Sequence, residues 1–248
     1  MASKTFYAII AGVGAGTGRS VALRFAQAYP VVLLSRKPES YSDIVSEIRA
    51  RGGEAYGHSV DVSDPEGVAA TFQAIKQELP DRKLVAAIYN AGAGYAIKPF
   101  LEQTLSDLEA SLASNVHGLF NFAQHSLPLL LSSVPAAPPH PPTLLVTGAT
   151  ASLRGSARFG TFAAGKFAVR ALTQSLAREF GPQGVHVAHV VVDGVIDIPR
   201  TAGFVVNEGR EDGKLNPDAI AESYFHLHTQ HRSSFTQELD LRPYVEKF

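Results

Sequence analysis

Short apolar runs alternate with longer amphipathic stretches along the whole chain, and this alternation restricts the possible folds more than any other feature. Several of the runs consist almost entirely of Val, Ile, Leu and Ala, as expected for strands that helices cover on both faces. Regular alternation of strands and helices predicts an α/β fold with a doubly wound, mostly parallel sheet. The predicted strands are Phe6–Gly12, Val31–Ser35, Ala55–Val60, Leu84–Asn90, Thr143–Gly148, Val185–Val192 and Glu238–Leu241. The predicted helices lie near Gly18–Ala28, Tyr41–Arg51, Pro65–Leu79, Ser106–Leu131 and Phe162–Phe180, with a further one from Pro217 onward.

Length and composition limit the classes of function. The 248 residues are 45% hydrophobic and 18% charged, as in a typical globular protein, and without an evident break we expect one domain over residues 1–248. The net charge of −1, without a long basic run, argues against a nucleic-acid partner. The apolar run Phe6–Val13 is too short to span a bilayer and lacks a signal-peptide cleavage site, so we expect a cytoplasmic protein that does not enter a membrane.

One segment, residues 132–142, is biased in composition because it contains five prolines. Proline at that density neither continues a helix nor joins the interior of a sheet. We therefore predict a stiff surface loop, with a docking site for a proline-recognising partner as the alternative.

A glycine-rich segment follows the first predicted strand and precedes a helix. Glycines at that place permit a tight turn and let the backbone approach a pyrophosphate, which the N-terminus of the helix then stabilises. The segment predicts a dinucleotide site that includes Gly12, Gly14, Gly16, Thr17 and Gly18.

Further motifs accompany this turn: Asn90-Ala91-Gly92 after the fourth strand, Asn115 in the long central helix, Lys166 in the next helix, and Asp61-Val62 after the third strand. Together they resemble the short-chain dehydrogenase/reductase family over essentially the whole chain. The resemblance implies a seven-stranded Rossmann sheet with the cofactor at the carboxyl ends of its strands. It also implies that Asp61 and Val62 lie at the adenine, Asn90 and Gly92 beside the adenosine ribose and the nicotinamide, and Lys166 at the nicotinamide ribose.

The residues that follow the second strand bear on the type of cofactor. A carboxylate there would accept hydrogen bonds from the adenosine ribose and repel a 2′-phosphate. Ser35, Arg36 and Lys37 instead offer a hydroxyl and two cations, so we predict NADP(H). The alternative is a solvated basic turn.

In the resembled family a tyrosine lies four residues before the lysine, and a serine lies thirteen residues before that tyrosine. Here those positions hold Phe162 and Ala149, and a register shift of one residue would place Thr150 at the serine position. General acid catalysis contributes roughly 10²–10⁴ in rate and one oxyanion donor roughly 10²–10³, so we expect very poor reduction of ordinary ketones.

Other groups are candidates to replace the tyrosine. Lys166 could act through water, because the resemblance implies that Asn115 connects the lysine to solvent. Tyr95 and Asp193 are further candidates, with a hydrophobic lid residue and a loop cap as the respective alternatives. The family usually has proline in place of Asp193 and threonine in place of Ile198. The resemblance still allows Gly194, Ile196 and the backbone to hold the nicotinamide amide.

Three functions remain compatible with these residues. The first is an NADP(H)-dependent reductase of an activated electrophile, such as an iminium ion, an enone or a quinone. The second is a non-redox isomerase or cyclase, and the third is a catalytically silent protein that binds NADP(H) or serves as a partner subunit.

The expected substrate lid, residues 199–216, and nearby aromatic side chains suggest a small hydrophobic or aromatic substrate. The predicted apolar lining comprises Phe100, Phe159, Phe162, Phe204 and Val205. The resemblance also suggests a homodimer or homotetramer, with Ala163, Ala164, Gly165 and Ala168 permitting close helix contact.

Several histidines raise the question of a metal site. His226, His228 and His231 lie close together in sequence, but residues two apart on a helix point to different faces. We therefore expect a solvated helix face and no metal site. His189, within an apolar strand, is expected to be buried and satisfied rather than catalytic.

Overall fold

The computed structural model describes residues 5–92 and 96–247. A seven-stranded sheet has the order β3-β2-β1-β4-β5-β6-β7, and every neighbouring pair is parallel. The strands are β1 (Phe6–Ala11), β2 (Val31–Ser35), β3 (Ala55–Ser59), β4 (Lys83–Tyr89), β5 (Thr143–Thr147), β6 (His186–Val192) and β7 (Glu238–Leu241). The predicted α/β class and parallel sheet are confirmed.

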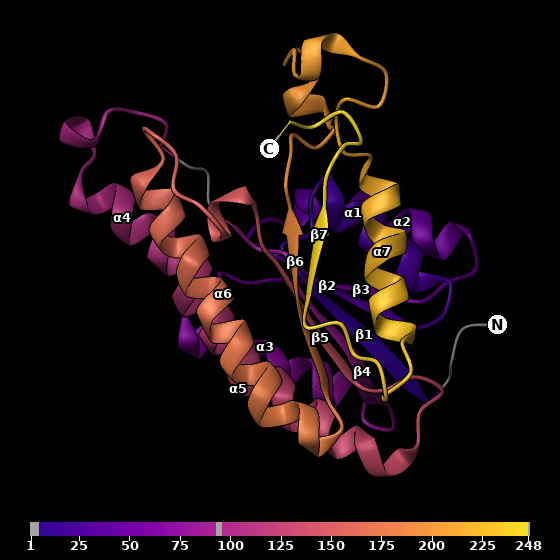
Figure 1. Cartoon of the computed structure of the whole chain (residues 1–248). Helices are drawn as coiled ribbons and strands as arrows, with labels where there is room; N and C mark the ends of the chain where they lie inside the picture. The colour runs from indigo at the N-terminus through magenta and orange to yellow at the C-terminus, as the bar shows by residue number, and fades with distance from the viewer. Residues whose placement is uncertain (1–4, 93–95, 248) are drawn as a thin grey trace.

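Helices cover both faces of this sheet (Figure 1). One layer contains α1 (Thr17–Ala26), α2 (Ser42–Ala50) and α7 (Pro217–Thr229). The other contains α3 (Pro65–Glu78), α5 (Gly118–Ser133) and α6 (Gly160–Phe180), with α4 (Leu105–Leu112) packed on α6. Because both faces are covered, the central strands are buried along nearly their whole length, which explains their continuous apolar sequences.

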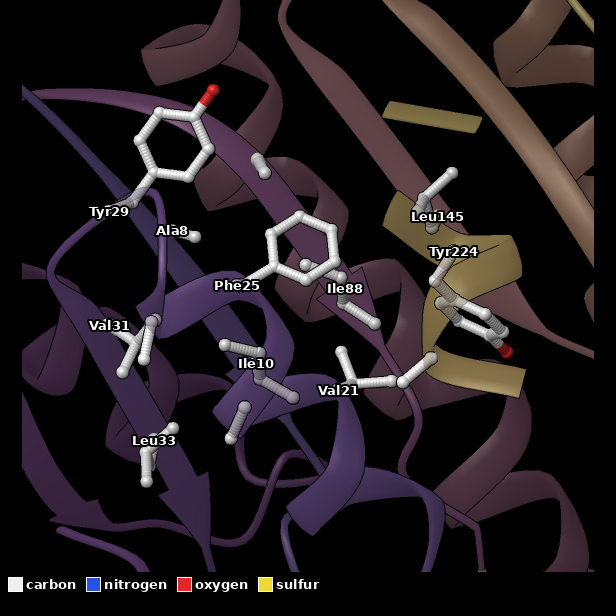
Figure 2. Close-up of a cluster of buried hydrophobic side chains, with 14 of the residues drawn as sticks. Ala8, Ile10, Val21, Phe25, Tyr29, Val31, Leu33, Ile88, Leu145 and Tyr224 are labelled. Atoms are coloured by element: carbon white, nitrogen blue, oxygen red, sulfur yellow. The ribbon is translucent and has the colours of Figure 1, made fainter. Parts of the chain in front are cut away.

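The layer of α1 and α7 encloses the core drawn in Figure 2. Phe25 of α1 and Tyr224 of α7 are fully buried there, above Ile10 and Ile88 of the neighbouring strands β1 and β4. Helices α1 and α7 are distant in sequence but contact each other over this part of the sheet. A buried apolar side chain contributes roughly 1.5–3 kcal/mol relative to an exposed one, so this cluster is a major stabilising feature.

Local signals fix where several helices begin. The Asp64 side chain accepts a hydrogen bond from the Glu66 amide at the start of α3, and Pro65 occupies the first helical position. Thr104 and Asp107 form a reciprocal capping box at α4. These short polar caps satisfy amides that a helix leaves unpaired at its first turn.

The single central helix predicted from the sequence is interrupted by a π turn at Ala113–His117, between α4 and α5. The helix also extends to Ser133, so it takes the first two residues of the predicted loop at 132–142. A 3₁₀ turn at Val134–Ala136 follows, and the remaining prolines carry the chain back to β5.

The expectation of a solvated helix face is wrong for His228. Its side chain is fully buried, its Nδ1 lies 3.0 Å from the Thr143 hydroxyl, and its Nε2 lies 3.0 Å from the Tyr29 hydroxyl. His226, on the same helix, is exposed. Helix α7 packs against α1 and β5, and its inward face buries the ring of His228. The local sequence pattern does not distinguish this histidine from its neighbours.

Candidate active site

The turn after β1 is compact because its glycines occupy places where a side chain would collide. Gly12 has φ +84°, and a Cβ built on it would lie 2.3 Å from the Ala91 nitrogen. A Cβ on Gly18 would lie 2.6 Å from the Gly12 oxygen. Both glycines are therefore required for the close approach of β1, β4 and the start of α1.

The N-terminus of α1 presents donors without a side-chain cap. Gly16 holds the N-cap position, and no acidic residue lies in the first turn. The Thr17 Oγ1 is buried and has no hydrogen-bond partner among the described residues. Unpaired donors at a glycine turn fit a dinucleotide pyrophosphate.

A cavity of about 1040 Å³ opens at the carboxyl ends of β1, β4, β5 and β6. It brings together most of the predicted site residues: Gly12, Gly14, Gly16, Thr17, Gly18, Asn90, Gly92, Ala149, Phe162, Lys166, Asp193, Gly194 and Ile196. Ser35, Arg36, Lys37, Asp61, Val62, Ala91 and Asn115 do not line it. Tyr95 lies outside the described residues.

Lys166 extends from α6 into this cavity and is only 6% exposed. Its Nζ donates a hydrogen bond to the Thr147 carbonyl at 3.2 Å. The Nζ also lies 6.0 Å from the centre of the Phe162 ring, one helical turn earlier. Burial without a nearby carboxylate lowers the pKa of Lys166 from 10.5 to about 8.

Asn115 lies in the π turn and is 1% exposed. Its Nδ2 donates to the Ser111 carbonyl at 2.9 Å, whereas its Oδ1 has no partner within the described part of the chain. The wider π turn lets this side chain face α6, where a Cβ on Gly165 would lie 2.5 Å from the Ser111 hydroxyl. The absence of a side chain on Gly165 therefore allows α6 to pack closely on Ser111 and Asn115.

Ala149 begins the loop after β5 and brings no polar side-chain group to the cavity. Its backbone nitrogen donates to the buried Ser152 hydroxyl at 3.1 Å. The neighbouring Thr150 hydroxyl, which does line the cavity, bonds to the carboxylate of Asp193. The sequence identified Asp193 as a candidate but did not reveal its partnership with Thr150, because the two residues meet only when β5 and β6 pair.

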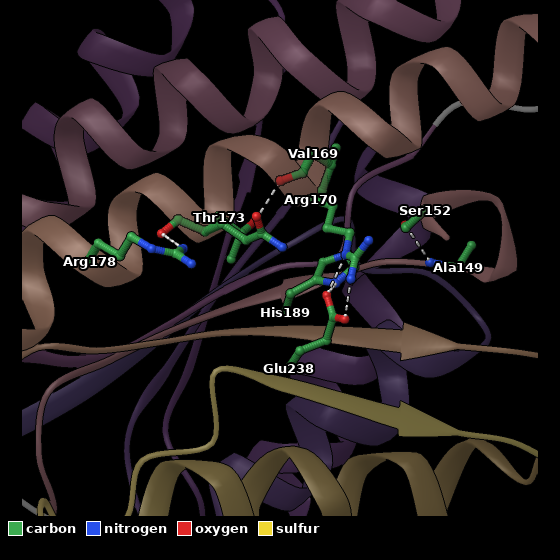
Figure 3. A network of polar contacts seen from close by, with 9 residues as sticks. Ala149, Ser152, Val169, Arg170, Thr173, Arg178, His189 and Glu238 are labelled. Atoms are coloured by element: carbon green, nitrogen blue, oxygen red, sulfur yellow. Dashed lines mark hydrogen bonds and ion pairs between the residues drawn. The ribbon is translucent and has the colours of Figure 1, made fainter. Parts of the chain in front are cut away.

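A polar network supports the strands below this loop (Figure 3). Glu238 accepts two hydrogen bonds from Arg170, at 2.7 and 2.8 Å, and its Oε2 lies 3.0 Å from the His189 Nδ1. Hydrogen bonds from Arg170 lower the pKa of Glu238, and burial lowers that of His189. The His189 Nε2 is buried without a partner in the described structure, so His189 is only partly satisfied.

Three hydrogen bonds connect Tyr224 of α7 to the glycine turn. The Tyr224 hydroxyl lies 2.7 Å from the Thr147 hydroxyl, which donates to the Asn90 Oδ1 at 3.0 Å. The Asn90 Nδ2 in turn donates to the Gly12 carbonyl at 2.9 Å. Asn90 is thereby held at the cavity wall in one orientation.

Known protein families were compared with the chain, and one family matches most of its length. The family model described as short chain dehydrogenase matches residues 7–203. The chain belongs to this family. Short chain dehydrogenases are NAD(P)-dependent oxidoreductases, and that broad class of activity follows from membership.

Individual relatives of this short chain dehydrogenase are distant. Cyclohexanol dehydrogenase from an Acinetobacter species is 28% identical over 211 residues, which cover 85% of this chain and 79% of the relative. A short-chain dehydrogenase structure from Rhodopseudomonas palustris is 31% identical with a TM-score of 0.78, over 98% of this chain and 100% of the other. A short chain dehydrogenase from Burkholderia cenocepacia, solved in complex with NADP, shares the fold with a TM-score of 0.84 and 23% identity, covering 98% of each chain.

In this dehydrogenase, Arg36 and Lys37 follow β2 and are exposed, and Ser35 is half-buried. Hydrogen bonds from Ser63 lower the pKa of Asp61, and the charge of Arg36 adds to that effect. Arg36 forms no ion pair with any residue that the structure describes. Its guanidinium is therefore available to a ligand.

The apolar lining of the dehydrogenase cavity differs from the predicted set. Phe159, Phe162 and Phe204 line it, but Phe100 and Val205 do not and are 75% and 82% exposed. The predictions for these two residues were wrong because the segments carrying them turn outward. Glu246, which accepts a hydrogen bond from Asn207 at 2.9 Å, lines the cavity and was not predicted from the sequence. Across residues 5–92 and 96–247, no helix is both long and apolar enough to cross a membrane.

Proposed function

We propose that this protein is an NADP(H)-dependent reductase whose substrate is an activated electrophile with an apolar body. The observation that carries the proposal is the pairing of Phe162 with Lys166. A ring without a hydroxyl lies one turn before the buried amine, and the described hydrogen bond of that amine goes to the Thr147 carbonyl. Phe162 and Ala149 thus leave the centre of the cavity without the two hydroxyls that the family resemblance leads one to expect.

The residues present fit a dinucleotide. The unpaired Thr17 hydroxyl and the uncapped N-terminus of α1 would hold the pyrophosphate, and Lys166 would hold the nicotinamide ribose. When bound, a reduced nicotinamide supplies a hydride. Asn115 and Lys166 would hold or move a proton at the Nζ atom, and the apolar wall formed by Phe159, Phe162 and Phe204 would exclude water from an aromatic substrate.

The class of electrophile follows from what the cavity lacks. Reduction of a ketone creates an alkoxide that must be stabilised and protonated, whereas reduction of an iminium ion gives a neutral amine. A quinone or an activated enone gives a delocalised anion, which requires less stabilisation. If both missing hydroxyls acted independently, their loss would raise the barrier to ketone reduction by about 5–9 kcal/mol.

Two observations support NADP(H) over NAD(H). Arg36 and Lys37 are exposed after β2, where a guanidinium fork and an ammonium suit a 2′-phosphate. The structural neighbour from Burkholderia cenocepacia was solved with NADP.

We further propose that the protein self-associates as a homodimer or homotetramer. Phe120 of α5 is 53% exposed and Phe167 of α6 is 43% exposed, and both helices belong to the layer on the same face of the sheet. Large exposed apolar side chains are typical of contact surfaces.

Fluorescence titration with NADPH and NADH, followed by stopped-flow mixing with cyclohexanone, an iminium salt and a naphthoquinone, tests the proposed function. We expect tighter binding of NADPH, rapid oxidation by the iminium ion or the quinone, and negligible oxidation by cyclohexanone. Cyclohexanone turnover as fast as that of the other electrophiles would contradict the proposal. Product formation without oxidation of NADPH would instead favour an isomerase or cyclase, and binding without any turnover would favour a silent NADP(H)-binding protein.

A further inference from the structure

Thr150 and Asp193 form a pair that faces the cavity. The Thr150 hydroxyl bonds to the Asp193 Oδ1, and both residues line the cavity next to Ala149. Asp193 is only 2% exposed, and its Oδ2 lies 3.2 Å from the Arg242 guanidinium. A nearly buried carboxylate thus has a counter-ion on one oxygen and a threonine on the other.

The direction of this hydrogen bond determines what the threonine offers to a ligand. An ionised carboxylate only accepts hydrogen bonds, so the single hydroxyl proton of Thr150 points to Asp193. The lone pairs of the Thr150 Oγ1 then remain as acceptors, and no described residue donates to them. The neighbouring Ala149 side chain adds no donor. This wall of the cavity therefore complements a ligand that donates a hydrogen bond, and it does not complement a bare carbonyl oxygen.

We infer that Thr150, oriented by Asp193, selects substrates that carry an N–H donor on the electrophilic group, that is, protonated imines. This inference rests on the proposed function and narrows its substrate class. The iminium carbon gains a C–H bond from hydride, the C=N π pair becomes the nitrogen lone pair, and reduced nicotinamide dinucleotide is oxidised by two electrons. No proton transfer is needed, which agrees with the absence of a hydroxyl at Phe162.

Positive charge alone is not what the pair recognises, because Arg242 balances the carboxylate of Asp193. Two probes of equal charge separate the alternatives. Tetrahydroisoquinolinium carries N–H donors, whereas N,N-dimethyltetrahydroisoquinolinium has none. Both carry an aromatic ring, which we expect to pack against the wall that contains Phe159, Phe162 and Phe204.

The test is calorimetric titration of the full chain with each probe, with and without NADP⁺. A hydrogen bond to a charged group corresponds to roughly a 10- to 100-fold difference in affinity, so the N–H probe should bind more tightly by that ratio. Thr150→Val should abolish the difference, and Thr150→Ser should retain it. Thr71→Val, which removes a hydroxyl on α3 that donates to the Gly67 carbonyl, is the matched control and should change nothing.

An unchanged ratio in the folded Thr150→Val variant would overturn the inference, and so would loss of the ratio in Thr71→Val. Equal affinity of the two probes for the wild-type protein would overturn it as well. Kinetics distinguish this failure from failure of the proposed function. If NADPH reduces dihydroisoquinolinium and its N-methyl analogue equally well in both wild type and Thr150→Val, the reductase stands and the role of Thr150 does not. If no electrophile oxidises NADPH, the proposed function fails, while the titrations without NADP⁺ still report on Thr150.

Discussion

The Nε2 of His228 lies 3.0 Å from the hydroxyl of Tyr29, although the two residues belong to opposite ends of the chain. The ring is fully buried, and burial lowers the pKa of His228 to about 3, while burial raises that of Tyr29 to about 12. Each group therefore stays neutral across the physiological range, and the contact between α7 and the segment after α1 depends on that neutrality.

Acidification should destabilise the protein through His228. In the unfolded state His228 binds a proton below about pH 6.5, whereas the buried ring of the folded state does so only below about pH 3. The stability that depends on the neutral ring is therefore fully present above pH 6.5 and is lost as the pH falls toward 3. The free energy of unfolding should drop by about 2 kcal/mol between pH 7 and pH 5 from this group alone. Urea unfolding at the two pH values should show a weaker dependence for His228→Gln. His226→Gln, an exposed change on the same helix, should retain the full dependence.

The buried amine of Lys166 should lower the free energy of unfolding, although it contributes to dinucleotide binding. Its folded pKa of about 8 lies below the ordinary 10.5, so the unfolded state holds more protons between these values and stability rises with pH across that window. Lys166→Met should raise the free energy of unfolding of the dinucleotide-free protein at pH 7 by up to about 3 kcal/mol and remove this rise.

The same substitution should weaken NADPH binding in a fluorescence titration. Lys83→Met, an exposed change at the start of β4, is the matched control for both measurements. A destabilised Lys166→Met protein would show that the buried amine is compensated by contacts other than its hydrogen bond to Thr147.

Introducing two hydroxyls into the cavity should create ketone reductase activity. The double variant Phe162→Tyr with Ala149→Ser places a phenol one turn before Lys166 and a hydroxyl beside Thr150. We expect kcat/KM for cyclohexanone to rise by at least about 10²-fold, since each group contributes that order of magnitude. Phe167→Tyr, on the exposed side of the same helix, should leave the rate unchanged. No gain in a variant that still binds NADPH would mean that the cavity differs in more than these two side chains.

Arg36 should set the preference for phosphorylated dinucleotide. Arg36→Asp replaces a free guanidinium with a carboxylate, so NADPH affinity should fall by roughly 10- to 100-fold. NADH affinity should stay the same or improve, because the new carboxylate can accept hydrogen bonds from the ribose. Arg232→Asp, an exposed change beyond α7, controls for net charge. Equal losses for both dinucleotides would indicate a role in folding rather than in selection.

Exposed phenylalanines should hold copies of the chain together. Phe120→Glu combined with Phe167→Glu should lower the molar mass measured by light scattering to that of one chain, because two charges would be desolvated in the contact. Tyr244 is 80% exposed elsewhere, and Tyr244→Glu should leave the mass unchanged. If the wild-type protein is already a single chain, the proposed association is wrong.

The strands of the sheet could be predicted from the sequence because strands buried on both faces consist almost entirely of Val, Ile, Leu and Ala. The run at β6, for example, is buried at every position. It also located the glycine turn, since Gly12 and Gly18 are needed wherever backbones approach so closely. These features depend on local sequence, and local sequence is sufficient to detect them.

Features created by tertiary contact were missed. The π turn around Asn115 packs against Gly165 of α6, and no periodicity in the sequence predicts it. Three further features join segments from distant parts of the chain. They are the hydrogen bond between Thr150 and Asp193, the burial of His228, and the position of Glu246 at the cavity. Phe100 and Val205 do not line the cavity, contrary to the prediction, because hydrophobicity alone does not indicate which way a loop turns.

The bonded series from Tyr224 through Thr147 and Asn90 to Gly12 ties the floor of the cofactor cleft to the last helix. Residues of α7 therefore help to hold the binding site in place, although they are buried behind its wall. Anyone redesigning this turn for another coenzyme would have to treat the helix and the turn as one part.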